Sequence, residues 1–591
     1  MMTKTNKDNW ILFALIVCHS ALLFYRYLEI PFSHDELSAI NRCRFLNFND
    51  LIQQGVKPDG HPEGVQILLW GLTKSFGYTE WALKLPFVLA GIGSTIFLFK
   101  STKIVFKMEA AILASCLFIG LEYFLTQQAY IRPYSIGLFL NLGLFFFILK
   151  VLNTKKWTFY YLFIILFSTL SYYTHYFSFL QSIMLWFGVF FMFYKNINVK
   201  YFIRSFCLSI IFFLPHLGIT SYQLSMGGLG WLGKPELNFI SSFYLNLFNS
   251  SLVFLIIAVI LLMLSLFQYK KHSKMYAFLI LLWLLPLLIL WTYSVFNAPV
   301  LQPSALYFSS PFLIILMGNS INIFSKNSTK ALLISILLFI FIGTLILSKH
   351  FYKQRYFSPI KAFINQSNLY LKNNPKDSVL ILWQGNSNYF NFYNLKFLNP
   401  LKVIFTDTSS YFVTRHYNTI ICNELPPEKM HQVGEQFPYL YAKDFNFSYT
   451  FYALKNEANN SPLYKRVNNF QFTFTKNEEW SRSFSFNLLE EGITKNMFLE
   501  LIPQLDSTIN NAELVMELYD KNERIDWRSI PLKPNSILSA KLKDIIKSEK
   551  IEKHHTAKIF IWNKDKQKMQ PIDALLIIRI DNPCEYSGNW D

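Results

Sequence analysis

The sequence is short of charged residues, of cysteine pairs and of glycine-rich loops, and each shortage excludes a class of protein. Only 16% of the 591 residues are charged, whereas 52% are hydrophobic and 18% are aromatic, which is not the composition of an ordinary soluble domain. The 6 cysteines form no CxxC pair, which argues against a zinc ribbon, a redox motif or a disulfide framework. No Walker-type or dinucleotide-type glycine loop occurs, so no nucleotide cofactor is expected.

What the chain does contain is a series of long apolar runs before about residue 350. The first run, from Trp10 to about Leu28, follows Lys4 and Lys7 and has no small-residue cleavage site after it. At about 1.5 Å per helical residue it is long enough to cross a bilayer, so we expect an uncleaved first span with its N-terminus inside. A run at 65–76 is too short to cross and predicts an interfacial helix. Further spans are expected at about 81–99, 109–127, 135–152, 157–173, 176–194, 201–221, 243–267, 275–295, 306–323 and 329–348, which makes about eleven.

The formal net charge of +18 follows from this topology and does not indicate a nucleic-acid partner. The lysines gather in short gaps between apolar runs, on the side of the N-terminal lysines, as the positive-inside rule requires. The basic gaps lie at about 100–107, 155–156, 195–204, 270–274 and 326–330. An odd number of spans places the loop after the first span, and everything after about residue 350, on the outer side.

Beyond residue 350 the composition changes and two further regions are expected. Short buried strands at 378–383, 402–406 and 419–422, separated by polar and partly helical segments, predict a small α/β domain over 351–464. Period-2 alternation around 470–474, 484–488 and 514–518, with more strands at 557–562 and 574–580, predicts an antiparallel β-sandwich over 465–591. The transmembrane part then covers 1–350.

Acidic residues stand directly after the first span, in the stretch His34-Asp35-Glu36. Ionisable side chains at a membrane boundary are costly unless they face water, a polar cavity or a ligand. Neighbouring residues point in different directions, so one acid can enter a cavity while the other orients it. A carboxylate beside a low-dielectric region suits a general base, which makes Asp35 a candidate, although a solvated loop acid is the alternative.

Three more polar patches fall on the same side. His61 and Glu63 suit a sugar or phosphate contact or, with Asp35, a divalent cation, but equally a locally capped helix start. Arg132 offers a planar fork of donors to a phosphate, or extends to lipid headgroups. His175 stands in a tight aromatic turn, where interfacial residues of this kind are common.

In order, these loops read HDE, GHPEG, QQAYIRPYS and YTHYF. This order resembles the membrane glycosyltransferases of the GT-C superfamily, over about residues 10–400. More narrowly, it resembles the glycosyltransferase family 39-like group of dolichyl-phosphate-mannose protein mannosyltransferases and aminoarabinose transferases. The resemblance implies a polytopic α-helical, GT-C-like membrane fold. It also implies an inverting enzyme that moves a sugar from a polyprenyl-phosphate carrier to a lipid, polysaccharide or protein acceptor on the outer face.

The same resemblance assigns roles to residues. It implies that Asp35 is the base that deprotonates the acceptor, with Glu36 in support. It also implies that His61, Arg132 and Tyr134 contact the carrier phosphate or sugar, and His175 matches the THYF element.

There are departures from the family pattern. Many relatives show HPPL where this chain has His61-Pro62-Glu63-Gly64, and an Arg-Tyr pair where it reads Gln302-Pro303-Ser304-Ala305-Leu306-Tyr307. A different donor, or a cation in place of the arginine, would account for this.

Two alternatives of other kinds stay open. A transporter or lipid flippase would place ionisable residues near the middle of the spans, whereas the charges here gather at their ends. A polysaccharide polymerase or ligase acting on diphosphate-linked oligosaccharides fits the same outer face. Lys, Asn, Ile and Phe usage favours an AT-rich bacterial genome, hence an inner membrane, undecaprenyl phosphate and a periplasmic site. The β-sandwich is expected either to bind glycan acceptors through exposed aromatic residues or to serve structure or partner binding.

Overall fold

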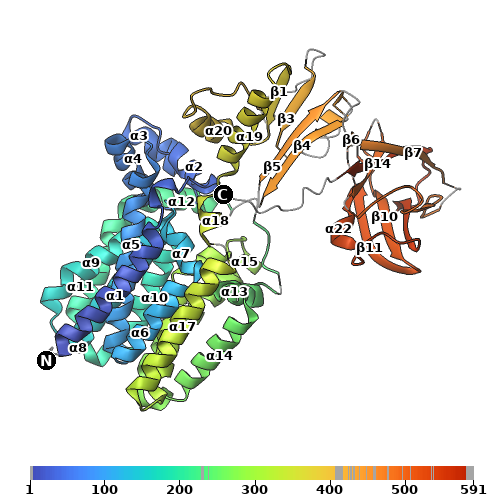
Figure 1. The fold of residues 1–591 in the computed structure, drawn as a ribbon. Coiled ribbons are helices and arrows are strands. Elements are labelled where there is room, and N and C mark those ends of the chain that lie inside the picture. The colour runs from blue at the N-terminus through green and yellow to red at the C-terminus, as the bar shows by residue number, and fades with distance from the viewer. Residues whose placement is uncertain are drawn as a thin grey trace. The chain divides into compact units, whose positions relative to one another are not determined.

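The chain divides into two units, Met1–Phe357 and Ser358–Asp591, which are coloured from blue to red in Figure 1. The computed structural model describes residues 4–580 apart from 228–231, 237, 350, 406–416, 424, 426–428, 430–432, 435, 438, 447–448, 457–460, 463, 475–477, 496, 506, 534–535 and 537.

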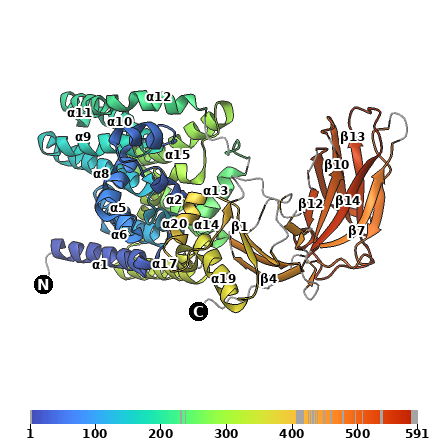
Figure 2. The same cartoon turned by 90° about the horizontal axis from the view of Figure 1, so that it is seen from above.

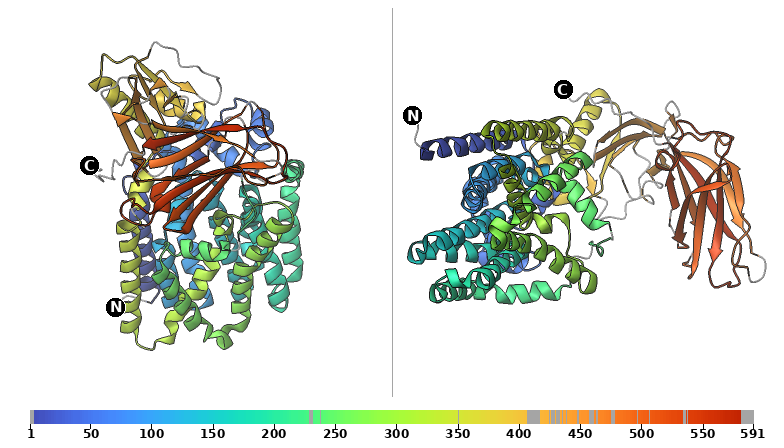
Figure 3. Two further views of the ribbon diagram at one scale, coloured as in Figure 1. Left: turned by 90° about the vertical axis from the view of Figure 1, so that its right-hand side faces the viewer. Right: turned by 90° about the horizontal axis from the view of Figure 1, so that it is seen from below.

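The first unit is a bundle of helices that run roughly side by side (Figure 3). The N-terminus lies at one end of the bundle and the short helices α2, α3 and α4 lie at the other (Figure 1). The helices are α1 (Lys4–Phe24), α2 (His34–Asn41), α3 (Phe48–Asp50), α4 (Gly64–Phe76), α5 (Glu80–Val105), α6 (Met108–Gly120), α7 (Glu122–Gln128), α8 (Pro133–Thr154), α9 (Trp157–Thr174), α10 (Tyr176–Phe193), α11 (Val199–Phe213), α12 (Leu217–Ser225), α13 (Phe239–Leu247), α14 (Leu252–Leu266), α15 (Ser273–Phe296), α16 (Ser310–Gly318), α17 (Asn327–Leu347) and α18 (Phe351–Tyr356).

Within the described residues, 7 helices are long and apolar enough to cross a membrane, or up to 9 if each of two bent pairs counts as one span. The two remaining expected spans correspond to α9 and to the shorter apolar segment Ser310–Ile323. The prediction of a polytopic helical membrane protein is confirmed, and the count of eleven stays a prediction. The short helix expected at 65–76 is present as α4, and its place at the membrane interface stays a prediction.

Two helix pairs are sharply bent, α6 with α7 by 69° and α13 with α14 by 90°. Asn249, which lies in the second bend at a φ of 57°, is buried and joins the two. Its Nδ2 donates to the backbone oxygen of Gly120 (3.1 Å), and its Oδ1 accepts from the backbone N–H of Glu122 (2.9 Å). One amide therefore pairs the backbone groups that the first bend leaves without helical partners.

The second unit begins with a mixed six-stranded sheet in the order β2-β1-β3-β5-β4-β6, in which β2, β1 and β3 run parallel. The predicted strands are present, although residue 406 lies outside the described residues, and β4 and β5 were not predicted. The elements are α19 (Pro359–Asn373), β1 (Val379–Trp383), α20 (Ser387–Asn394), β2 (Ile404–Phe405), β3 (Thr419–Cys422), β4 (Tyr439–Asn446), β5 (Tyr449–Lys455) and β6 (Ser461–Pro462).

The rest of this unit is a β-sandwich of two four-stranded antiparallel sheets, β11-β10-β13-β8 and β12-β9-β14-β7. A β-sandwich was predicted, although β9, β11 and β12 were not among the predicted strands. Figure 2 shows β10 beside β13 and β14 beside β7. Alternate residues of both sheets, such as Leu514, Ile559 and Leu576, form one shared core. The elements are β7 (Tyr464–Phe472), β8 (Phe484–Asn487), β9 (Met497–Gln504), β10 (Ala512–Asp520), β11 (Glu523–Pro531), β12 (Leu538–Lys541), α22 (Leu542–Ile545), β13 (His555–Asn563) and β14 (Ile572–Ile580).

Candidate active site

Glu36 is an internal anchor of α2. Its side chain is fully buried and forms an ion pair with Lys84 of α5, which is also fully buried. It accepts two further hydrogen bonds, from the backbone N–H of Ser33 (2.7 Å) and of Ile131 (3.0 Å). The Ser33 bond completes a capping box at the start of α2. Glu36 thus ties α2 to α5 and to the segment before α8, and its position does not support a direct catalytic role.

Asp35 points elsewhere. It is exposed in the first turn of α2, because the inward direction is taken by Glu36. The low-dielectric position expected from the sequence is therefore wrong for Asp35. Its charge acts on Tyr130, whose pKa is raised to about 12, mainly by burial and further by the negative charges of Glu36 and Asp35. The carboxylate of Asp35 is open to a substrate from the solvent side.

A second polar cluster forms around Asp59, which is only 5% exposed. Its Oδ1 lies 2.7 Å from Nη1 of Arg42 and 3.5 Å from Nδ1 of His61. Its Oδ2 accepts from Nε2 of Gln66 (3.2 Å). Burial alone would raise the pKa of Asp59, but His61, Arg42 and Arg132 outweigh it and hold that pKa well below its usual range. Asp59 thus stays charged and holds His61 in place.

His175 joins this cluster from the turn between α9 and α10. Its ring centroid lies 4.8 Å from that of His61 and 5.4 Å from that of Tyr134. Burial, and then the charges of His61 and Arg132, keep the pKa of His175 well below its usual value. Its Nδ1 accepts from the backbone N–H of Phe177 (3.0 Å), so the neutral ring carries its proton on Nε2.

Two further residues fix this arrangement. Gly64, at the start of α4, approaches the turn before His175 so closely that a Cβ there would lie 2.6 Å from the backbone oxygen of Tyr173. The hydroxyl of Tyr134 donates to Oγ of Ser304 (3.1 Å).

Arg132, at the N-terminus of α8, is partly exposed, and its buried Nε has no hydrogen-bond partner within the described residues. The structure therefore brings His61, Arg132, Tyr134 and His175 together, and Asp35 is not part of this group.

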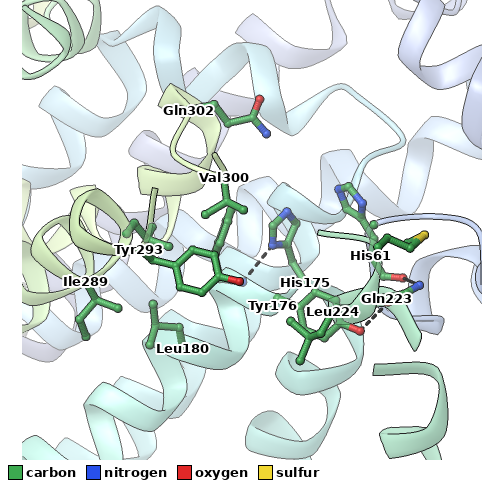
Figure 4. Close-up of a pocket in the computed structure, with 14 residues that line it drawn as sticks. His61, His175, Tyr176, Leu180, Gln223, Leu224, Ile289, Tyr293, Val300 and Gln302 are labelled. Carbon is green, nitrogen blue, oxygen red and sulfur yellow. Dashed lines mark hydrogen bonds between the residues drawn. The ribbon is translucent and has the colours of Figure 1, made fainter. Parts of the chain in front are cut away.

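A cavity of about 290 Å³ opens beside His61 and His175. Figure 4 shows these two rings and Gln302 at one side of it, with Leu180, Leu224 and Ile289 among the apolar residues around the rest. Gln223 lines the same cavity and donates from Nε2 to the backbone oxygen of His61 (3.0 Å). The cavity is thus polar near the histidines and apolar elsewhere, which suits an amphipathic ligand.

The residues expected to hold a divalent cation do not fit one. His61 faces Asp59, whereas Glu63 lies 3.4 Å from Nδ1 of His216, so Asp35, His61 and Glu63 are not gathered as ligands. Across the described ranges, one trio has ligand atoms within 4.8 Å of one another, and it lies in the β-sandwich: Asp520, His554 and His555. There, Nδ1 of His555 already accepts from the backbone N–H of Glu552 (2.9 Å).

Sequence reasoning missed Asp59, Arg42 and Lys84. Lys84 carried a usable signal, because a lysine four residues into a predicted span is costly unless a carboxylate pairs with it. Asp59 stands two residues before His61 and was passed over as part of a polar loop. Nothing in the local sequence of Arg42 marks it as a partner of Asp59.

No protein-family model and no curated protein matches this chain. Among solved structures, it is similar to ArnT from Cupriavidus metallidurans, with 9% identity and a TM-score of 0.49 over 77% of this chain and 99% of that chain. Another structure of that protein, bound to undecaprenyl phosphate, gives 10% identity and a TM-score of 0.47 over 77% and 99%. The archaeal oligosaccharyltransferase AglB from Archaeoglobus fulgidus, in complex with an inhibitory peptide and a dolichol-phosphate, is 11% identical, with a TM-score of 0.44 over 78% and 75%.

Proposed function

We propose that this chain is an integral-membrane inverting glycosyltransferase. Its donor is a sugar on a polyprenyl-phosphate carrier, and its acceptor is a hydroxyl or amine of a lipid, polysaccharide or protein. The observation that carries the proposal is the cavity beside His61 and His175, polar at one side and apolar elsewhere. A polyprenyl phosphate has the same division, since its chain prefers hydrocarbon and its phosphate needs cationic or N–H donors.

The cluster supplies these donors. Arg132 keeps a buried Nε without a partner among the described residues, and a guanidinium stays charged and offers a planar fork to phosphate oxygens. The Nε2–H of neutral His175 is a further donor. Asp59 holds His61 and Arg42 by its charge, so the basic side chains are oriented before the donor arrives.

In the proposed reaction the acceptor oxygen or nitrogen forms a bond to the anomeric carbon while the bond from that carbon to the phosphate oxygen breaks. Asp35 takes the proton of the acceptor, and polyprenyl phosphate leaves with the bonding electron pair. Attack from the face opposite to the leaving phosphate inverts the anomeric configuration. Arg132 and His175 stabilise the charge that develops on the phosphate.

The test is transfer from a radiolabelled polyprenyl-phosphate sugar in membranes that contain the full-length protein. We expect Asp35→Asn to reduce transfer by about 100-fold to 10,000-fold, because the general base is lost, with unchanged expression. Asp50→Asn, in the same outer loop, is the matched control and should retain activity. Near wild-type transfer by Asp35→Asn would reject Asp35 as the base. Transfer from diphosphate-linked oligosaccharides alone would reject the donor and favour a polymerase or ligase.

We further propose that the site faces the outer side of a bacterial inner membrane. In a Cys207→Ser, Cys584→Ser background, which removes an exposed thiol and the cysteine near the C-terminus, Asp35→Cys should react with a membrane-impermeant maleimide in spheroplasts. Lys107→Cys, in a loop predicted to lie inside, should react only after the membrane is opened. The reverse labelling pattern would contradict the assigned orientation.

A further inference from the structure

The β-sandwich carries an aromatic surface that the proposed reaction does not use. Along β13, alternate residues Ala557, Ile559 and Ile561 enter the shared core. Because side chains alternate across a strand, Phe560 and Trp562 stand on the opposite, outer face of the sheet.

Strand register brings further aromatic residues to this face. Glu513 of β10 pairs with Trp562 of β13, and Glu517 of β10 pairs with Trp527 of β11. Glu513 and Glu517 are four residues apart on one strand, so both tryptophans lie on the same side of the sheet. Trp480 pairs with Trp562 through an isolated bridge. We call Trp480, Trp527, Phe560 and Trp562 the tryptophan face.

The rings of the tryptophan face are packed against one another; Phe560 is buried beneath them, Trp562 is partly exposed, and Trp480 and Trp527 are exposed. Trp480 stacks on Trp562 with centroids 5.3 Å apart and planes 11° from parallel. Trp527 meets Phe560 at 6.0 Å and Trp562 at 6.4 Å, edge to face. Trp480 is 43% exposed and Trp527 is 37% exposed. Burying a tryptophan side chain stabilises a fold, so a surface with a purely structural role would cover these rings. Two exposed tryptophans on a folded sheet give up that stabilisation.

Cations lie over three of the rings, Lys564 over Trp562 (4.6 Å), Arg524 over Trp527 (5.1 Å) and Lys558 over Phe560 (5.5 Å), and the first two of these cations also pair with carboxylates. Lys564 lies 2.5 Å from Glu513, and Nη1 of Arg524 lies 2.9 Å from Glu517. The indole N–H of Trp562 donates to Oε1 of Glu479 (3.1 Å). These pairs fix the side chains and balance their charges, which does not favour a polyanion such as nucleic acid. Their remaining lone pairs and N–H groups suit neutral hydroxyls.

We propose that the tryptophan face binds pyranose rings of the glycan that the enzyme extends or decorates. A pyranose presents a face of C–H bonds with slight positive character to the electron-rich face of an indole, while its hydroxyls reach the surrounding carboxylate and amino groups. The identity of the glycan rests on the proposed function, because an acceptor held by the same chain gains a high local concentration near the catalytic groups. The binding itself does not depend on that function.

The experiment uses full-length protein in detergent and envelope glycans released from the cells that produce it natively. Retention of fluorescently labelled glycans by the immobilised protein is titrated. We expect Trp527→Leu and Trp480→Leu each to weaken binding about tenfold or more, and Trp527→Phe to recover part of it, because a phenyl ring still stacks. Stacking on an aromatic ring is worth about 1–3 kcal/mol for flat rings such as bases, and tenfold is about 1.4 kcal/mol. Leu489→Ala removes an exposed apolar side chain of the sandwich outside the tryptophan face and should bind as wild type.

Two outcomes overturn the inference: no retention of any released glycan by the wild-type protein, or equal retention by the wild type and the leucine variants. Thermal unfolding of each variant checks that the sandwich is folded, and a folded variant that retains glycan counts against the proposal. Failure of the proposed function is distinguishable. Asp35→Asn should retain glycan while losing transfer. If the wild-type protein retains glycan but transfers no sugar from any polyprenyl-phosphate donor, the result supports glycan binding by the tryptophan face and rejects the proposed function.

Discussion

The buried pair of Glu36 and Lys84 makes a quantitative prediction. In Glu36→Gln, the amide has one oxygen in place of two, so the negative charge that faces Lys84 is lost together with the acceptor of one backbone N–H, either that of Ser33 on Oε2 or that of Ile131 on Oε1. Both side chains are fully buried, and a buried charge left without its partner costs about 3–5 kcal/mol. We therefore expect the apparent thermal midpoint of the solubilised protein to fall by on the order of 10 °C. Lys84→Met alone should cost a similar amount.

The double variant decides whether this reasoning holds. Replacing both partners removes both buried charges, and such exchanges are often neutral or stabilising by about 1–4 kcal/mol. Glu36→Gln with Lys84→Met should thus be more stable than either single variant by several kcal/mol, as measured by thermal unfolding in one detergent. The matched control is the exposed pair of Lys103 and Asp8, 2.6 Å apart, where Lys103→Met should change stability by about 0–1 kcal/mol. A double variant no more stable than the worse single variant would refute the assignment.

Three further predictions concern the cluster at the cavity. Asp59→Asn should lower the free energy of unfolding by about 2 kcal/mol, because Arg42 loses its charged partner, and should raise the donor KM in the transfer assay; an unchanged KM would contradict the orienting role. His175 has a depressed pKa, so below about pH 6.5 the unfolded chain binds a proton that the folded chain does not. Stability should therefore fall between pH 7 and 5 by up to about 1.4 kcal/mol per pH unit, and His175→Phe should flatten this dependence in thermal unfolding. Gly64→Ala should destabilise by about 1–3 kcal/mol through overpacking, whereas Gly71→Ala, with open space at its Cβ, should be neutral or slightly stabilising; equal effects would count against the close approach.

Much of the architecture could be predicted because its signals are local. Apolar runs specify helices, and period-2 alternation at Phe470, Phe484 and Leu514 specifies strands whose inner residues share a core. The strands β4 and β5 escaped prediction because their residues, Tyr439–Asn446 and Tyr449–Lys455, show no clean alternation and are held by pairing with β3 and with each other. The bends in α6–α7 and α13–α14 were missed because residues far apart in the chain determine them.

The sequence predicted which residues come together at the site better than it predicted how their side chains are arranged. His61, Arg132, Tyr134 and His175 were expected to meet, because each stands in a loop predicted to lie on the same side of the membrane. The sequence predicted that Asp35 and Glu36 point in different directions. Which of the two points inward depends on Lys84, 48 residues away from Glu36. Partners at that distance leave no periodic signal near the acids themselves.

The shared amide of Asn249 has a mechanical consequence. The bend between α6 and α7 and the bend between α13 and α14 are more than 120 residues apart in the chain and are joined by one side chain, so moving the two bends apart would leave the backbone oxygen of Gly120 and the backbone N–H of Glu122 without this partner. These two hydrogen bonds therefore oppose a displacement of α14 relative to α7, and α7 is held on to the segment before α16 as well, because the hydroxyl of Tyr307 donates to the backbone oxygen of Phe124 (3.1 Å).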